Sequence, residues 1–443
     1  MKLPLLGALQ SLLPPLTLTF LLAINGCSDS ASPDALLAPP GTTIPALPAP
    51  PGTTSPGVAP PEGRVGGEAP FTEPAVPAAV PAAVPAAVPA AVPAAVPAAV
   101  PAAVPVGRFS ELVTGLSEPD GDFISDNLIS NETSYLQVAG ELASRREGGV
   151  YIGVGPEQNF TYIALSRPQV AFIVDIRRGN MLQHLYFKAL FDEARSRSHF
   201  LALLLGRPHE GEGDPGAGAD LEAVIAHAER RAPDERTLTA TFEGALGRIE
   251  QGYGVPLNAK DRKTLEVIAR RFQEQQLGIR FELHESSGRR YPSLRELLVQ
   301  ADPGGARRGF LASEEAFRLV QRMQREHRII PVVGDFAGDR AMPGIAALLR
   351  EKRLTVGAFY VSNVEQYLLE PKVWEKWMRN VAALPANEAS VFVRAYLDQG
   401  RRHPRQMQGH RTATVLQKMM DFKAHQEKAR YRTFWAIATD GAP

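Results

Sequence analysis

Residues 150–159, with the sequence Val-Tyr-Ile-Gly-Val-Gly-Pro-Glu-Gln-Asn, predict the fold. The first four form a short apolar run that is typical of a buried strand, and Pro156 has the fixed φ that suits the first turn of a helix. Between them, Gly153 and Gly155 allow the backbone to turn sharply and to approach a ligand closely. We therefore expect a strand, a glycine turn and a helix that extends to about Leu165.

The chain after this turn alternates apolar, β-branched runs with segments of helical period. A second strand is expected at Val170–Asp175, followed by a helix from about Met181 to Arg195. This alternation is typical of right-handed crossovers, so the predicted fold class is a doubly wound, mostly parallel, Rossmann-type α/β sheet covered on both faces. The further strands are expected at 329–335, 356–361, 390–397 and 432–438, and the further helices at about 344–350, 372–383 and 412–428.

One interval interrupts the alternation between the second and third strands. We interpret residues 196–327 as a large, mostly helical insertion, which either caps the site or enlarges the core. Helical period is visible within it at 221–232, 259–276 and 314–325, and residues 211–218 are expected to form a loop.

The N-terminus indicates export. Residues 1–26 begin with Lys2 and continue in a leucine-rich run, as in a signal peptide, and Pro14-Pro15 argues against a membrane-spanning helix. Ile24-Asn-Gly-Cys27 resembles the lipobox of bacterial lipoproteins. The resemblance implies lipidation at Cys27, which is the one cysteine of the chain, and an extracytoplasmic protein anchored to a membrane of the cell envelope. The alternative is a stray thiol in a disordered leader.

Residues 27–107 are predicted to be a disordered tether. They are rich in Pro, Ala, Gly, Ser and Thr, and the tetrapeptide Pro-Ala-Ala-Val repeats between Pro77 and Val104. Proline at every fourth position blocks a helix, and the segment has too little apolar mass for a core. We expect it to hold the folded domain, residues 108–443, away from the membrane. A binding site for a proline-recognising partner is the alternative.

Composition and missing motifs exclude several classes of function. The chain has 48 Lys and Arg residues and 48 Asp and Glu residues, so no overall positive field favours nucleic acid. It has no phosphate-binding P-loop, no GxSxG nucleophile elbow, and neither HExxH nor paired Cys/His spacing. We therefore expect no nucleic acid and no metal, and the sequence identifies no catalytic residue.

Acidic residues beside the glycine turn indicate the class of ligand. Asp175 ends the second strand, where a carboxylate can accept hydrogen bonds from ribose hydroxyls. Glu157 stands in the first helical turn, where a pyrophosphate would otherwise bind, so it argues against NAD or FAD and leaves room for a ligand with an ammonium group. The alternative is a glutamate that only stabilises its helix.

These features resemble the class I S-adenosylmethionine-dependent methyltransferase superfamily. Residues 332–335 are similar to its third-strand acid motif, and residues 359–364 are similar to its fourth strand, whose end lines the pocket. The family's acid for the amino-acid end of the ligand is replaced by Tyr151, and our hypothesis is that Glu157 takes its place. The implied cofactor-binding residues are Gly153, Gly155, Glu157, Gln158, Asn159, Asp175, Arg177, Asp335, Ser362 and Asn363.

The domain also resembles a group of uncharacterised bacterial proteins that share Ser-Asn-Glu-Thr-Ser, GVGPEQN and GDFAG segments. The polar stretch of residues 123–135, which contains the first of these segments, adds the pocket candidates Asn127, Ser130, Asn131 and Glu132. Alternatively, Ser130 with Thr133, or Asn131 with Ser134, caps a helix at 135–143.

Three functions follow from these resemblances: an S-adenosylmethionine-dependent enzyme of unknown substrate, a binder of another small molecule, and a structural or interaction lipoprotein with a vestigial site. Export argues against the first, because S-adenosylmethionine is made in the cytoplasm.

Overall fold

The structure is a computed structural model that describes residues 103–145, 148–285, 289–398, 400–428 and 431–440. The chain divides into two units, Met1–Val92 and Pro93–Pro443, and these residues all belong to the second. The expected signal segment, Cys27 and the tether up to residue 102 lie outside the described residues. Within the described ranges, no helix combines the length and the apolar character needed to span a bilayer.

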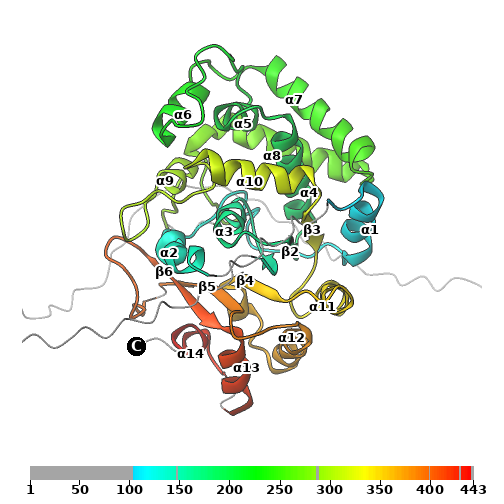
Figure 1. The fold of residues 1–443 in the computed structure, drawn as a ribbon, viewed down its shortest axis with the longest axis vertical. Helices are drawn as coiled ribbons and strands as arrows, with labels where there is room; N and C mark the ends of the chain where they lie inside the picture. The colour runs from blue at the N-terminus through cyan, green and yellow to red at the C-terminus, as the bar shows by residue number, and fades with distance from the viewer. Residues whose placement is uncertain (1–102, 146–147, 286–288, 399, 429–430, 441–443) are drawn as a thin grey trace, which may run out of the picture. The chain divides into compact units, whose positions relative to one another are not determined.

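Six strands form one mixed sheet in the order β3-β2-β1-β4-β5-β6 (Figure 1). β1 to β5 are parallel, and β6 pairs antiparallel with β5. This strand order is that of a doubly wound sheet. The chain adds strands toward one edge from β1 to β3 and toward the other edge from β4 onward, so the order reverses between β1 and β4. The predicted mostly parallel sheet is confirmed. The strands are β1 Val150–Gly153, β2 Val170–Asp175, β3 Ile329–Val333, β4 Val356–Ser362, β5 Val391–Leu397 and β6 Thr412–Lys418.

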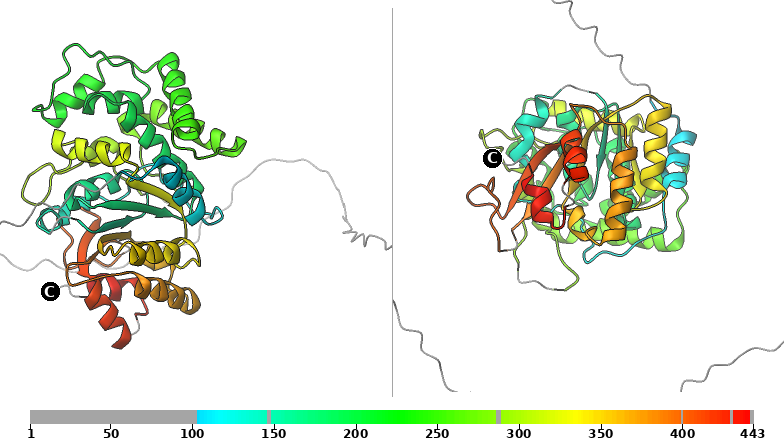
Figure 2. Two further views of the ribbon diagram at one scale, coloured as in Figure 1. Left: turned by 45° about the vertical axis from the view of Figure 1, so that its right-hand side comes forward. Right: turned by 90° about the horizontal axis from the view of Figure 1, so that it is seen from below.

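Helices cover both faces of the sheet (Figure 2). One face carries α3 (Gln158–Ser166), α4 (Arg178–Glu193) and α10 (Glu314–Arg325), and the other carries α11 (Ala341–Glu351), α12 (Pro371–Ala383) and α13 (Met419–Lys428). α1 (Val106–Leu116) packs beside β3 at the sheet edge. The short elements are η1 Tyr135–Val138, α2 Ala139–Ala143, η4 Val364–Tyr367 and α14 Phe434–Thr439.

The chain between β2 and β3 adds an outer helical layer, which packs on α4 and α10 (Figure 1). The predicted helices near 221 and 259 are present in this layer, and the predicted helix near 314 is α10. The layer and its connections contain α5 Arg197–Leu204, α6 Leu221–Ala228, α7 Glu235–Gly247, η2 Arg248–Gly252, α8 Ala259–Gln275, η3 Gln276–Gly278 and α9 Leu294–Leu298.

An aromatic cluster joins the two helical layers. The ring of Phe191 in α4 lies 5.2 Å from that of Phe160 in α3 and 4.3 Å from that of Phe200 in α5, measured between centroids. All three side chains are buried. Burial of each phenylalanine contributes about 1.5–3 kcal/mol, so the outer layer shares one core with the helices on the sheet.

Two predicted elements near the C-terminus are wrong. Residues 412–418 were expected to begin a helix but form β6, because Thr412, Thr414 and Val415 are β-branched and the edge of β5 offers them backbone partners. Residues 432–438 were expected to form a strand but largely belong to α14. The Thr433 side chain accepts a hydrogen bond from the Ala436 amide and starts that helix.

Candidate functional site

A segment ahead of β1 crosses the carboxyl ends of the strands. We call this segment, residues 117–134, the strap. Ligands of doubly wound sheets bind at these strand ends, beside the point where the strand order reverses. The strap therefore covers the edge at which a ligand is expected. The strap forms hydrogen bonds along this whole edge, from β3 to β6. In chain order the pairs are Glu118 with Val333 of β3, Gly121 with Ile176, Ser130 with Glu157, Glu132 with Ser362, and Ser134 with Thr412 of β6.

The glycine turn is held by its own side chains. Gly155 has a φ of +77°, which a glycine adopts without strain. The Asn159 amide donates to three carbonyl oxygens of residues 154–156 at 2.8–3.0 Å, and the Tyr151 hydroxyl donates to Asn159 Oδ1 at 2.8 Å. A Cβ on Gly153 would collide with Asn159 and Tyr151. Gly153 and Asn159 thus serve the geometry of the turn.

Glu132 is a carboxylate that the strap buries against β4 and α3. Its Oε1 accepts hydrogen bonds from the Tyr360 hydroxyl at 2.6 Å and the Ser362 hydroxyl at 2.5 Å. Its Oε2 accepts from Gln158 Nε2 at 2.8 Å. The residue is 1% exposed, and burial raises the pKa of its carboxyl above the ordinary value in spite of these three donors.

Glu157 is the second buried carboxylate, and it lies at the start of α3. Its Oε1 accepts a hydrogen bond from the Ser130 backbone amide at 3.2 Å, and its Oε2 has no hydrogen-bond partner among the described residues. Burial, with a smaller contribution from the negative charge of Glu132, raises its pKa to about 7 against the opposing effect of the backbone hydrogen bonds. Glu132 and Glu157 are called the acid pair below.

No cation neutralises the acid pair within the part of the chain that the structure describes. The buried carboxylate of Glu365 shows the usual solution. It accepts from Arg394 Nε at 2.5 Å and Nη2 at 3.0 Å, and both residues are fully buried. Because an unpaired buried charge is costly, the acid pair either holds protons or binds a positive group supplied from outside the domain.

Two small cavities meet at Glu157. One is apolar and is lined by aromatic residues that include Phe160, Phe200 and Phe310. The other has a mixed lining that includes Ser130, Gln158 and Thr161 together with Leu297, Leu298 and Phe310. Each has a volume of about 10 Å³, which is enough for about one water molecule. A nucleoside would therefore enter only after the strap moves.

Asp175 is paired within the protein. Its carboxylate oxygens accept from Arg177 Nε at 3.0 Å and Nη2 at 2.9 Å, and Arg177 Nη1 donates to the Asp126 carbonyl of the strap. Asp175 is 4% exposed. The expected ribose acceptor thus positions an arginine that holds the strap, and it is available to a ribose only if this arginine moves.

Asp335 closes the loop that follows β3. Its Oδ1 accepts from the Ala337 amide at 2.9 Å. The neighbouring anion-binding position is filled by Glu118 of the strap, whose carboxylate accepts from the amides of Asp335, Arg340 and Ala341, each at 2.9 Å. Ala341 begins α11, so Glu118 occupies the favourable N-terminus of that helix.

A family match covers residues 128–255 and 257–441. This chain belongs to the family described as Domain of unknown function (DUF7790). The matched part of the DUF7790 domain contains all six strands, the outer helical layer and the acid pair. No curated protein matches the chain.

The DUF7790 domain brings together only part of the predicted set. Ser130, Glu132, Glu157, Gln158 and Ser362 form one hydrogen-bonded group. Asp175, Arg177 and Asp335 have the other partners described above. Asn363 accepts from the Ser362 hydroxyl at 3.3 Å, Asn127 lies beside Gly155, and Asn131 is half-buried in the strap.

The helix-cap interpretation of the strap is wrong. η1 begins after Ser134 without a side-chain cap, because the Ser134 hydroxyl is instead within hydrogen-bond distance of the hydroxyls of Thr412 and Thr414 in β6. Sequence reasoning also missed Tyr360 and Glu118. Tyr360 stands within an apolar strand pattern, and Glu118 belongs to a segment without periodicity, so neither carried a local signal.

Proposed function

We propose that this domain binds S-adenosylmethionine, or a related nucleoside that carries an ammonium group, at the acid pair beneath the strap. One observation supports this most strongly: Glu132 and Glu157 are buried without a cation among the described residues. S-adenosylmethionine carries an ammonium and a sulfonium group. A positive charge within about 4–6 Å would favour the ionised carboxylates and offset the cost of their burial.

The place of the acid pair in the sheet supports the same ligand class. Glu157 follows β1, and Glu132 contacts Ser362 at the end of β4. Nucleoside ligands of doubly wound sheets lie between these strand ends, at the switch in strand order. Glu157, which directly precedes α3, would take the ammonium end of the ligand, in the role that Tyr151 cannot fill.

Backbone strain supports an opening of the strap. Asn127 in the strap and Ser362 at the end of β4 have φ values of 48° and 51°. This left-handed conformation is uncommon for residues other than glycine and is frequent at ligand sites. We interpret residues 196–327 as a helical insertion that caps the site, since Phe200 and Leu204 of α5 line the apolar cavity beside Glu157.

The proposal places this domain in the cell envelope. Cys27 would carry the lipid, and residues 27–107 would be the tether that links the membrane to the domain. Methyl transfer is the reaction that the family resemblance implies, and we assign no residue to catalysis. Labelling of the exported chain with palmitate, and loss of that label in Cys27→Ala, tests the anchor.

A structural or interaction role is the second candidate, and the state of the strap favours it. Asp175 is already paired with Arg177, and the backbone amides after β3 already donate to Glu118. Each cavity at Glu157 has room for about one water molecule. In that case the strap is a permanent part of the core.

Thermal unfolding of the full chain with a series of ligands separates the two candidates. S-adenosylmethionine, S-adenosylhomocysteine and adenosine share the nucleoside, but adenosine lacks the ammonium group. We expect the first two to raise the melting temperature. At a ligand concentration 100 times the dissociation constant, they should increase the free energy of unfolding by about 2.7 kcal/mol, whereas adenosine and NAD should have little effect. No stabilisation by any of them would favour the structural role.

A further inference from the structure

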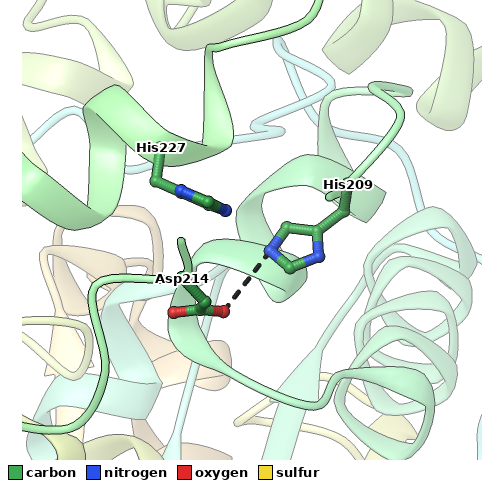
Figure 3. Close-up of side chains that lie close together, drawn as sticks. All are labelled: His209, Asp214 and His227. Atoms are coloured by element: carbon green, nitrogen blue, oxygen red, sulfur yellow. Dashed lines mark ion pairs between the residues drawn. The ribbon is translucent and has the colours of Figure 1, made fainter. Parts of the chain in front are cut away.

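A second group of polar side chains lies in the outer helical layer. His209 and Asp214 belong to the loop of residues 206–220 after α5, and His227 belongs to α6. One ring nitrogen of each histidine and one carboxylate oxygen all lie within 4.8 Å of one another. Figure 3 shows the two imidazole rings and the carboxylate facing one another.

Asp214 is held in place by the start of α5. Its Oδ2 accepts hydrogen bonds from the hydroxyls of Ser196 at 2.5 Å and Ser198 at 3.0 Å, and its Oδ1 accepts from the Gly216 amide at 3.3 Å. Oδ2 also lies 3.5 Å from His209 Nε2. Carboxylates that bind metals are commonly oriented by such hydrogen bonds.

His227 keeps a ring nitrogen free, and His209 directs a ring nitrogen toward Asp214. His227 is 5% exposed, and its Nε2 lies 2.9 Å from the Glu210 carbonyl oxygen. If Nε2 donates this hydrogen bond, Nδ1 carries the lone pair, and this buried atom has no partner among the described residues. His209 turns its Nε2 toward Asp214, and this atom also lies 3.0 Å from the Ser198 hydroxyl. A buried polar atom without a partner is rare in a folded protein, and a bound ion would satisfy it.

We propose that His209, Asp214 and His227 bind one divalent transition-metal ion of the zinc type. Imidazole with a single carboxylate suits such ions, whereas Ca²⁺ and Mg²⁺ prefer sites made of oxygen atoms. Three protein ligands leave a fourth position for water or a ligand, as in catalytic zinc sites.

The geometry requires only a modest closure of the site. Zinc bonds of about 2.0–2.1 Å place tetrahedral ligand atoms about 3.4 Å apart. The contact between His209 and Asp214 already has this length, and the widest separation of 4.8 Å must shorten by about 1.4 Å. The loop that carries both residues contains Gly211, Gly213, Gly216 and Gly218, so its backbone can follow.

Binding of metal would stabilise the outer layer. The ion would link the loop to α6, and Asp214 would connect it to the N-terminus of α5 through Ser196 and Ser198. The opposite end of α5 lines the cavity at Glu157 through Leu204. The ion would therefore fix the helix that lines the cavity beside Glu157, although metal binding itself does not depend on the proposed nucleoside site.

The test is a calorimetric titration of the full chain with zinc chloride, after purification without a histidine tag and treatment with a chelator. We expect one equivalent of zinc and a higher melting temperature. Asp214→Asn and His227→Gln should each weaken binding at least about tenfold, whereas His425→Gln, which changes an exposed histidine of α13, should not.

Circular dichroism of each variant without metal shows whether it folds. Substitution of cobalt for zinc in the folded wild type adds a second readout, because tetrahedral cobalt has intense visible absorption. Absence of binding to the wild type, or equal binding by wild type, Asp214→Asn and His227→Gln, would overturn the proposal.

Discussion

The Tyr360 hydroxyl donates a hydrogen bond of 2.6 Å to the Glu132 carboxylate, and this contact joins the strap to β4 at the point where the strand order reverses. A residue that precedes the sheet in sequence therefore lies at the centre of its ligand edge. Glu157 lies beside it, also without a cation in the described structure. The behaviour of this acid pair is the basis of the proposed function.

Glu157 should make the stability of the domain depend on pH. Its pKa rises from 4.5 to about 7 on folding, so between these pH values the folded state keeps a proton that the unfolded chain loses. The stabilisation from this proton is complete below pH 4.5 and is lost as pH rises through 7, with a total of about 3 kcal/mol. Glu157→Gln should therefore resist urea better than the wild type at pH 8 and equally at pH 4.5.

Exposed Glu388 provides the matched control, because Glu388→Gln makes the same chemical change at the surface and should leave the urea midpoint unchanged at both pH values. A Glu157→Gln variant that is less stable than the wild type at pH 8 would show that the carboxylate is stabilising and paired.

Glu118 should anchor the strap. Glu118→Ala removes the acceptor for the amides of Asp335, Arg340 and Ala341, so we expect a loss of about 2–3 kcal/mol in the free energy of unfolding. Hydrogen exchange of the strap should become faster, and the affinity for an S-adenosylmethionine-type ligand should rise if the strap closes the site. Unchanged exchange in residues 117–134 would contradict this role of Glu118.

The buried ion pair of Glu365 and Arg394 should be a stability determinant. Trp377 Nε1 also donates to Glu365 at 3.2 Å. Arg394→Met leaves a fully buried carboxylate without its cation and should cost about 3–5 kcal/mol in chemical unfolding. Adding Glu365→Gln should recover part of this loss. A double variant as unstable as the sum of both single variants would contradict direct pairing.

Gly153 should be required for packing in the turn. Gly153→Ala places a methyl group against Asn159 and Tyr151 and should destabilise the domain by about 1–3 kcal/mol. Gly247 in α7 has open space around its Cα, so Gly247→Ala should stabilise by about 0.5–1 kcal/mol. Thermal unfolding of the two variants compares them directly, and similar melting temperatures would argue against the collision.

Much of the sheet could be predicted because its strands are short apolar runs between turns. The runs at 150–153 and 170–175 were expected with the bounds that the structure shows, since strands buried on both faces carry a local signal. β6 was missed because its antiparallel pairing with β5 is a tertiary contact. The Leu and Met residues after Val415 favoured a helix, which begins only at Met419.

The candidate site was predictable only in part. Glu157 and Gln158 follow a recognisable glycine turn, but the pairing of Asp175 with Arg177 depends on side-chain geometry that spacing does not reveal. The group of His209, Asp214 and His227 had no recognisable motif, because its members are scattered over a loop and a helix and meet only in the folded outer layer.

The acid pair should bind the ammonium group of a nucleoside ligand. This binding is measured by calorimetric titration of S-adenosylmethionine into the full chain at pH 8, with Glu132→Gln, Glu157→Gln and the surface control Glu388→Gln alongside. We predict one site in the wild type and the control, and at least about tenfold weaker binding in the two acid-pair variants, since each loses a buried charged partner. No binding to the wild type, or one affinity shared by all four proteins, would contradict the claim.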